Sequence, residues 1–363
     1  MTRPRKRVSL ALQGGGAHGA YTWGVLDRLL EEDLFEIAGI TGASAGAINA
    51  AAVVDGHAEA GSEGARERLR QLWSAVAEQA RLSPFKRSPL NVWLGDWSLD
   101  NSPGKVWFDF VSHFVSPYDF NPMDINPLRR VLAELIDFER IRQASGQKLF
   151  ISATRVSDGK LRVFRNSETT ADAVLASTCL PHLFKAVEID GDDYWDGGYA
   201  GNPVLFPYLF ESQADDVILV QLNPVRRAET PRSARQIADR VDEITFNASL
   251  QRELRALSFV ASMLKSGAKM PAGFRPLRIH RIDADVGLEP FSASSKMNAE
   301  RGFILHLHAL GRQAAEHWLA DNSALVGIRS SFDATGDMEF LPRSRPARER
   351  RTWRLPGRTG TDS

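Results

Sequence analysis

Residues 8–20 of the chain read Val-Ser-Leu-Ala-Leu-Gln-Gly-Gly-Gly-Ala-His-Gly-Ala, and residues 37–49 read Ile-Ala-Gly-Ile-Thr-Gly-Ala-Ser-Ala-Gly-Ala-Ile-Asn. In both stretches a short apolar run ends at a glycine-containing turn, and a helical pattern follows. Short apolar runs bounded by turn residues are typical of buried parallel strands. The order of strand, glycine loop, helix, strand, sharp turn and helix therefore predicts an α/β fold with a mostly parallel central sheet.

Further segments extend this pattern along the chain. Strands are predicted at 8–12, 35–40, 149–154, 161–164, 186–189 and 217–222, and helices at 20–32, 45–54, 236–265 and 299–320. Asp190-Gly191 is interpreted as a hairpin turn, because this dipeptide favours tight turns between strands. The last two helical patterns follow the last strand, so we expect the fold to end in C-terminal helices.

Changes in composition divide the chain into segments. We expect a basic N-terminal arm at 1–7, the main α/β domain at 8–225, a helical region at 226–341 and a disordered, arginine-rich tail at 342–363. Inside the main domain, residues 83–127 combine prolines with many aromatic side chains. A long irregular segment of this kind is typical of a lid, a binding loop or a cap. The alternative is that its rings fill a second core.

Composition excludes several classes of protein. The chain of 363 residues has 45 basic and 45 acidic side chains, a balance that gives no reason to expect nucleic acid as a partner. Its single cysteine, Cys179, excludes an internal disulfide and a cysteine-rich metal site. No apolar run approaches the roughly 18 residues of a membrane span. We expect a soluble, cytoplasmic protein, with peripheral contact at the inner membrane face left open; the sequence indicates no oligomeric state.

The first candidate motif is the glycine-rich loop from Gly14 to Gly19. Glycines let backbone N–H groups approach a ligand closely, and the start of a helix adds unpaired donors and the positive end of a dipole. Such a loop can hold a phosphate or the oxyanion of a tetrahedral intermediate. A dinucleotide site has a similar pattern, but it requires an acidic residue at the end of the second strand. That strand ends in Ile40-Thr41-Gly42, which argues against a nucleotide.

Ser44 is the candidate nucleophile. It lies in a G-x-S-x-G pattern, in which a sharp strand-to-helix turn exposes the serine oxygen and the flanking Gly42 and Gly46 relieve crowding. Serine needs a base to remove its proton. None of the histidines after Ser44 lies in an obvious catalytic context, and His182, which follows Pro181, is the one histidine kept as an alternative base.

Asp196 offers a second kind of base. It opens the motif Asp196-Gly197-Gly198, which alone would be interpreted as a turn. The glycine loop, the serine turn and this motif, in this order, resemble the patatin-like phospholipase family over roughly residues 8–225, and Ala-Ser-Thr-Cys-Leu-Pro at 176–181 is also similar to family members. The resemblance implies a three-layer patatin-like fold. It also implies lipid hydrolysis by a Ser–Asp dyad without histidine, metal or organic cofactor.

Carried onto this sequence, the resemblance assigns Ser44 as the nucleophile, Asp196 as the general base, and Gly14, Gly15 and Gly16 as donors to the oxyanion. A carboxyl group has a reference pKa of about 3.9, so it is a weak base near neutral pH. Burial raises the pKa of a carboxyl group. We therefore expect partly apolar surroundings for Asp196.

One position departs from the family pattern. The family commonly has Arg or Lys where this chain has His18, and a neutral histidine would attract a phosphate head group poorly. The expected partner is a lipid or another acyl ester, cleaved as by a phospholipase A or a lysophospholipase. The alternatives are hydrolysis of another hydrophobic ester, acyl transfer, and a non-catalytic lipid-binding protein.

Overall fold

The central sheet is mostly parallel, as the sequence predicts. The computed structural model describes residues 4–111, 114–227, 229–267 and 276–332. In this part of the chain one eight-stranded sheet has the order β5-β6-β3-β2-β1-β7-β8, and β4 also pairs with β3. Neighbours from β3 to β8 along this order are parallel, whereas β4 and β6 run antiparallel to β3. The strands are β1 (Lys6–Leu12), β2 (Phe35–Gly42), β3 (Lys148–Arg155), β4 (Leu161–Arg165), β5 (Val187–Ile189), β6 (Asp192–Asp196), β7 (Asp216–Gln221) and β8 (Arg278–Asp283).

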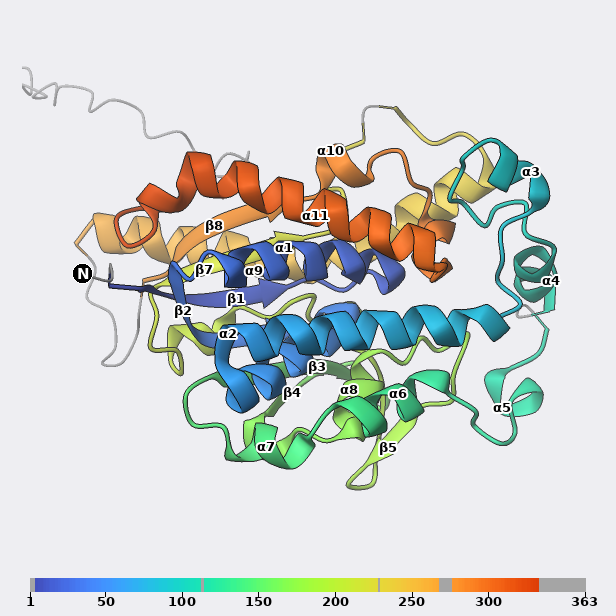
Figure 1. The fold of residues 1–363 in the computed structure, drawn as a ribbon, viewed down its shortest axis with the longest axis horizontal. Coiled ribbons are helices and arrows are strands. Elements are labelled where there is room, and N and C mark those ends of the chain that lie inside the picture. The colour runs from blue at the N-terminus through green and yellow to red at the C-terminus, as the bar shows by residue number, and fades with distance from the viewer. Residues whose placement is uncertain (1–3, 112–113, 228, 268–275, 333–363) are drawn as a thin grey trace, which may run out of the picture.

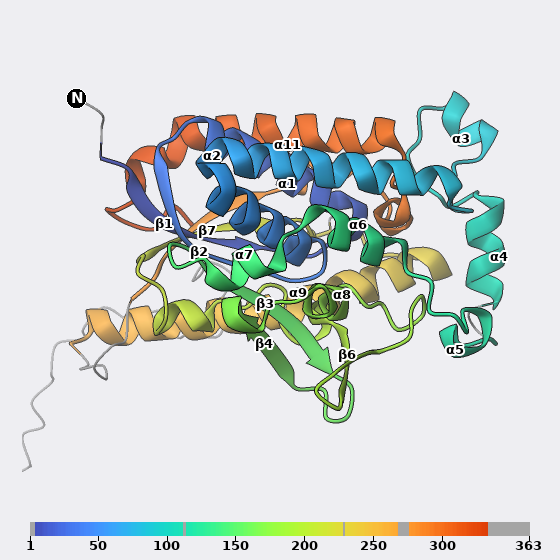
Figure 2. The ribbon, with the colours of Figure 1, turned by 60° about the horizontal axis from the view of Figure 1, so that its bottom comes forward.

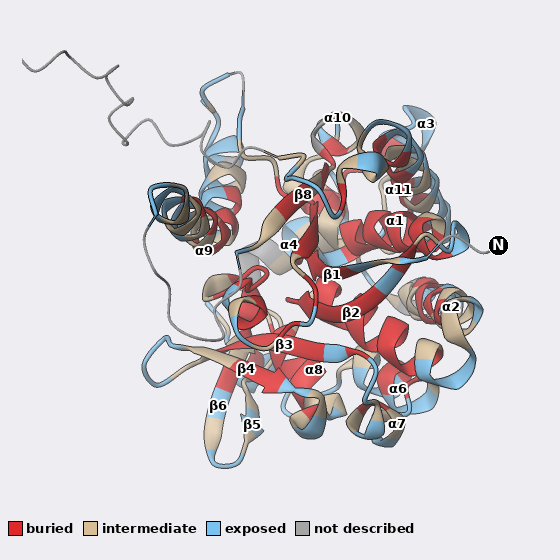
Figure 3. Ribbon diagram, turned by 90° about the vertical axis from the view of Figure 1, so that its left-hand side faces the viewer, coloured by how far each residue is buried: buried red, intermediate tan, exposed pale blue. Residues whose placement is uncertain are grey.

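Helices cover both faces of the sheet, which gives three layers (Figure 3). Helices α1, α2 and α11 lie together on one face, and α9 lies on the other (Figures 1 and 3). The helices are α1 (Gly19–Glu31), α2 (Ala45–Gln79), α3 (Pro89–Trp93), α4 (Pro103–Val111), α5 (Pro117–Phe120), α6 (Pro127–Leu135), α7 (Phe138–Gln143), α8 (Ala171–Ser177), α9 (Ala234–Lys265), α10 (Asp285–Leu288) and α11 (Arg301–Asn322). Across the described residues, none of these helices combines the length and apolar character needed to cross a bilayer.

Side chains of β1 alternate between two hydrophobic cores. Leu10 and Leu12 belong to the core shared with α1, α2 and α11, and Ala11 belongs to the core that α9 covers. In the first core, a Cβ at Gly24 of α1 would lie 2.0 Å from the carbonyl oxygen of His308 in α11. Glycine at this position therefore lets the backbones of α1 and α11 come into contact. Because of this contact, the C-terminal helix α11 is part of the main core.

The region expected to be helical, 226–341, also supplies a strand. β8 pairs in parallel with β7 and extends the sheet. Its sequence, Arg-Ile-His-Arg-Ile-Asp, is too polar to be recognised as a buried strand. The polar side chains are compensated because the Asp216 carboxylate accepts hydrogen bonds from Arg278 and His280. β6 was not predicted either, and it carries the candidate base at its end.

Two local predictions, the start of helix α2 and the hairpin turn at Asp190-Gly191, agree with the structure. Helix α2 begins at Ala45 as predicted but continues to Gln79, with a kink at Ala60 and Gly61, where Gly61 has a φ angle of 65°. The hairpin turn at Asp190-Gly191 is confirmed, because these residues join the antiparallel strands β5 and β6 and have φ angles of 53° and 82°.

The described residues between 83 and 127 form the short helices α3, α4 and α5, which lie together at one end of the molecule (Figures 1 and 2). The tryptophans of this insert have different environments. Trp97 stacks on Phe303 of α11 with ring centroids 5.2 Å apart, whereas Trp93 is 81% exposed. The insert therefore both packs on the core and presents apolar surface. The expected tail at 342–363 and residues 1–3 of the arm lie outside the described residues.

Candidate active site

Ser44 lies in the sharp turn between β2 and α2. Its φ of 52° and ψ of −125° belong to a region that residues with a side chain rarely occupy. The flanking glycines permit this turn, since a Cβ at Gly42 would lie 2.4 Å from the carbonyl carbon of Gly46, and a Cβ at Gly46 would lie 2.1 Å from the Leu12 carbonyl oxygen. The Ser44 N–H donates to the carbonyl and hydroxyl oxygens of Ser177, which fixes the turn.

Asp196 ends β6 and lies next to Ser44. The pairing of β6 with β3 carries its carboxyl group to the edge of the sheet where Ser44 follows β2. The side chain is completely buried. Its Oδ1 accepts a hydrogen bond from the Gly198 N–H at 2.7 Å, and its Oδ2 has no hydrogen bond of ordinary geometry within the described residues. Burial raises the pKa of Asp196 to about 7, against the smaller opposing effects of the Gly198 N–H and the Ser44 hydroxyl.

The glycine loop follows β1 and reaches the same edge of the sheet. The Gly14 N–H donates to Oδ1 of Asn202 at 2.7 Å, so it is already paired. Among the described residues, the N–H groups of Gly15 and Gly16 have no hydrogen-bond partner. Gly16 has a φ of 57°, and a Cβ there would lie 2.4 Å from the carbonyl oxygen of Lys296. The loop therefore offers two unpaired donors, where the sequence suggested three.

Three polar side chains that the sequence analysis did not single out hold this loop. Asn202 binds the Gly14 N–H, and Nδ2 of Asn223 donates to the Gly14 carbonyl oxygen at 3.0 Å. Nζ of Lys296 donates in turn to Oδ1 of Asn223 at 2.6 Å. These contacts join residues 188 and 209 positions apart in the chain, and no local motif marks them.

Three other titratable side chains lack the position or the charge of a catalytic base. His18 is buried and hydrogen-bonded to Ser295 at 2.7 Å, and burial together with the charge of Lys296 lowers its pKa to about 3, so it is neutral. His182 is exposed and does not line the cavity at Ser44. Burial raises the pKa of the Cys179 thiol to about 12. Within the described ranges, no group of three or more His, Cys, Asp or Glu could hold a metal ion.

A cavity of about 320 Å³ lies beside Ser44. Gly16 and Ser44 form its reactive side, and the rest of its lining is mainly apolar. Helix α2, the start of the insert, helix α6 and the segment after α8 contribute Ile48, Trp73, Phe85, Val131, Leu180 and Phe184 to this lining. Ser44, Gly16 of the glycine loop and an apolar space therefore meet at one place.

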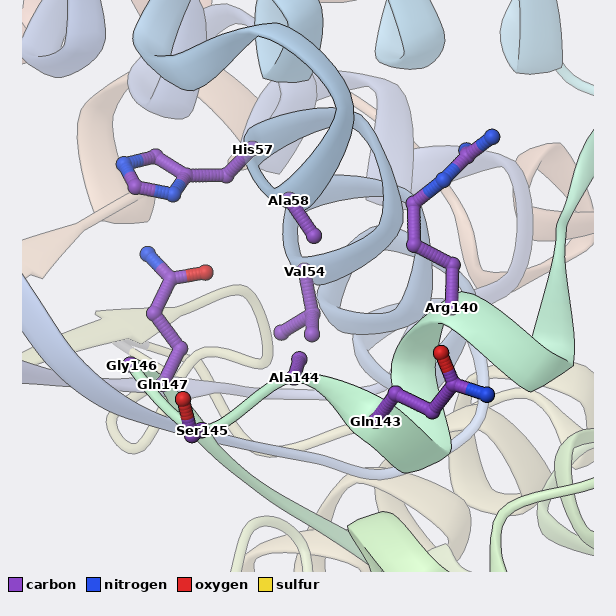
Figure 4. A pocket seen from close by; sticks show the side chains of 9 residues that line it. All are labelled: Val54, His57, Ala58, Arg140, Gln143, Ala144, Ser145, Gly146 and Gln147. Atoms are coloured by element: carbon purple, nitrogen blue, oxygen red, sulfur yellow. The ribbon is translucent and has the colours of Figure 1, made fainter.

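A second cavity, of about 340 Å³, lies between α2, α7 and the start of β3 (Figure 4). The side chains of His57 and Gln147 face each other across it, and Arg140 points away from them (Figure 4). The Arg140 guanidinium forms an ion pair with the buried Asp55 at 2.6 Å, so its charge is compensated within the protein. Neither the candidate nucleophile nor the candidate base lines this cavity.

A sequence model of the family described as patatin-like phospholipase matches residues 10–208, more than half of this 363-residue chain. The chain belongs to the patatin-like phospholipase family. This membership supports hydrolysis of lipid acyl esters as the class of activity. It also agrees with the observed fold, a mostly parallel sheet between layers of helices.

The solved structures to which this family member is similar include two bacterial proteins. One is VipD from Legionella pneumophila, with 13% identity and a TM-score of 0.39 over 87% of this chain and 68% of VipD. The other is the type III effector ExoU of Pseudomonas aeruginosa, with 16% identity and a TM-score of 0.36 over 87% of this chain and 53% of ExoU. No curated protein matches the sequence significantly.

Proposed function

We propose that the protein is a serine hydrolase that cleaves acyl esters of lipids, in the manner of a phospholipase A or a lysophospholipase. Ser44 is the nucleophile and Asp196 is the general base. The observation that carries this proposal is the contact between a serine in a strained turn and a fully buried carboxyl group of raised pKa, beside an apolar cavity.

The reaction proceeds in two halves. Asp196 accepts the proton of the Ser44 hydroxyl while its oxygen attacks the ester carbonyl carbon. The N–H groups of Gly15 and Gly16 donate to the oxyanion of the tetrahedral intermediate. The intermediate collapses to an acyl-enzyme while Asp196 gives the proton to the leaving oxygen, which departs as the alcohol. Water then attacks the acyl-enzyme and gives a proton to Asp196. The bond between the acyl group and Ser44 breaks, Asp196 returns the proton to the Ser44 oxygen, and the fatty acid leaves.

The protein environment compensates for the weakness of a carboxylate as a base. With its pKa raised to about 7 by burial, Asp196 holds a proton far better than an exposed carboxylate does. Its unpaired Oδ2 is the oxygen available for that proton. The contact between Ser44 and Asp196 lacks ordinary hydrogen-bond geometry, and catalytic hydrogen bonds often become well aligned only when substrate binds.

The cavity supports a substrate with an apolar acyl chain. Its walls are mainly aliphatic and aromatic, and such walls stabilise an acyl chain by removing it from water. Transfer of the acyl group to another acceptor would use the same acyl-enzyme. Product analysis with defined glycerolipids separates the outcomes, because hydrolysis yields free fatty acid and transfer yields a new ester.

Replacement of Ser44 tests the proposal directly. Ser44→Ala should lower turnover of a glycerophospholipid and of a soluble short-chain ester at least about a thousandfold, since the nucleophile is lost. A fluorophosphonate should label the parent protein and not the variant. Ser145→Ala is the matched control, because Ser145 is an exposed serine at the second cavity. Turnover by Ser44→Ala close to that of the parent would refute the assignment.

A further inference from the structure

Exposed apolar side chains gather on the insert. We define the end face as the exposed large apolar residues of this segment: Leu90, Val92, Trp93, Leu94, Val106, Trp107, Phe114, Tyr118, Phe120, Met123 and Ile125. They belong to α3, α4, α5 and the adjoining turns, which together form one end of the molecule (Figures 1 and 2). Single exposed apolar residues are ordinary, whereas a gathering of this kind marks an interaction surface.

The end face is continuous with the cavity at Ser44. Phe85 lines that cavity, and Phe108 of α4 packs edge-on against it with ring centroids 5.4 Å apart. Phe108 also packs edge-on against Phe120 of α5 at 5.9 Å, and Phe120 is exposed on the end face. A row of three rings therefore leads from the cavity wall to the surface.

The opposite wall of the cavity is joined to the insert by hydrogen bonds. Leu180 and Phe184, which follow α8, line the cavity. Directly after them, Nζ of Lys185 donates to the Pro122 carbonyl oxygen at 2.8 Å, and the next residue in the chain donates its N–H to the Tyr118 hydroxyl at 3.3 Å. Both walls of the cavity therefore contact the insert that carries the end face.

The charges of the insert indicate the kind of ligand. Residues 84–127 contain the basic residues Lys86, Arg87 and Lys105 and the acidic residues Asp96, Asp100, Asp109, Asp119 and Asp124. Arg87 is paired with Glu300 at 2.8 Å. A surface that binds anionic lipids carries a cluster of basic residues, and this segment carries a small acidic excess. Its tryptophans and tyrosine instead match the amphipathic rings that favour the head-group level of a bilayer.

We propose that the end face docks on a zwitterionic phospholipid bilayer and places the cavity at the membrane surface. The apolar side chains of α3, α4 and α5 enter the interfacial layer, so an acyl chain passes from the bilayer to the cavity without crossing water. The role given to the cavity rests on the proposed function. The docking itself requires no catalysis, so the two can fail separately.

The test measures sedimentation with phosphatidylcholine vesicles in the Ser44→Ala background, so that the vesicles are not degraded. Trp93→Ala combined with Trp107→Ala should weaken vesicle binding by about tenfold or more, since two interfacial rings are lost. The matched control is Phe259→Ala combined with Met263→Ala. These residues are 54% and 42% exposed at the C-terminal end of α9, which lies away from the insert (Figures 1 and 2). The control should bind vesicles like the parent.

Further measurements separate the outcomes. With Ser44 intact, the tryptophan variant should keep its melting temperature and its turnover of a soluble short-chain ester, and vesicle binding should not fall between low and high salt. Three results would overturn the docking proposal: equal binding by parent and tryptophan variant, binding that requires anionic lipid and disappears in high salt, or a dimer that the tryptophan substitutions dissociate. Vesicle binding without any ester hydrolysis by the parent would instead retain the docking and reject the proposed function.

Discussion

The turn at Ser44 holds a residue with a side chain in a backbone conformation that favours glycine. Its φ of 52° and ψ of −125° imply strain on the order of 1–3 kcal/mol. Ser44→Gly should therefore unfold at a higher temperature than Ser44→Ala, because both substitutions remove the hydroxyl and only glycine relieves the strain. Thermal unfolding by calorimetry measures the difference. Equal melting temperatures would show that the turn stores no strain.

The raised pKa of Asp196 predicts the pH dependence of the reaction. A general base acts only when it is deprotonated, and a carboxyl group with a pKa of about 7 is largely protonated below pH 7. The value of kcat/KM for a soluble ester should therefore rise about tenfold per pH unit below pH 7 and level off above it. A profile that levels off near pH 4 would show a carboxylate of ordinary pKa.

Two substitutions identify the group that titrates. Asp196→Asn keeps the shape of the side chain but cannot accept the proton, so it should lose nearly all activity at every pH. His182→Ala should change the rate little, because His182 is exposed and lies outside the lining of the cavity. An inactive His182→Ala together with an active Asp196→Asn would make the histidine the base.

Local chemistry explains which residues of the site could be predicted. Ser44 lies in a motif whose glycines permit a sharp turn, so the sequence proposes it as a nucleophile, whereas Asp196 is proposed through the resemblance to the family because its own motif indicates only a turn. We expected partly apolar surroundings for Asp196, and in the structure its side chain is completely buried. The contacts of Asn202 and Asn223 with Gly14 depend on how β1, β6 and β7 are arranged in space. The spacing of these residues along the sequence does not predict that arrangement.

At the scale of elements, the glycine loop depends on a distant one-turn helix, Ala293–Met297. A Cβ at Gly16 would lie 2.4 Å from the Lys296 carbonyl oxygen, and the residue has a φ of 57°. Gly16→Ala should therefore displace the loop and its N–H donors. We expect kcat to fall by about a hundredfold, with a smaller change in KM, since a misplaced donor loses stabilisation of the oxyanion.

Gly15→Ala is the matched control for this prediction. A Cβ at Gly15 would meet the end of the flexible Leu222 side chain at 3.0 Å, and its φ of −179° is accessible to alanine. We expect a smaller loss of kcat than for Gly16→Ala. If Gly16→Ala instead raised KM with kcat unchanged, the loop would serve substrate binding and not the oxyanion.

The environments of the aromatic residues in the insert could not be predicted from the sequence. Its aromatic content led equally to a cap and to a second core, and each description fits part of it. Trp97 packs on Phe303, whose helix follows much later in the chain, while Trp93 is 81% exposed. Two tryptophans four positions apart thus have opposite environments. Only the position of α11 distinguishes them.

At the scale of the whole molecule, the part of the chain after residue 225 completes the sheet and the core. β8 covers the outer edge of β7, and α11 covers α1 through the close approach at Gly24. The expected boundary at 225 therefore separates segments that share one core. Composition suggested this boundary because helical patterns follow it. The side chains of β8 are accommodated by hydrogen bonds from Arg278 and His280 to Asp216, which hydrophobic patterning does not detect.

Truncation tests this interdependence. A fragment of residues 1–225 would expose the edge of β7 and the apolar surface of α1 that α11 covers, and exposed strand edges and apolar patches promote aggregation. We expect this fragment to lack cooperative unfolding and ester hydrolysis. A fragment of residues 1–332 keeps α11 and the hydrogen bond from the Phe332 N–H to the Ile279 carbonyl oxygen. It should unfold cooperatively near the temperature of the full chain and hydrolyse a soluble ester at the same rate. A monomeric, active 1–225 fragment would instead show that residues 8–225 fold as an independent domain.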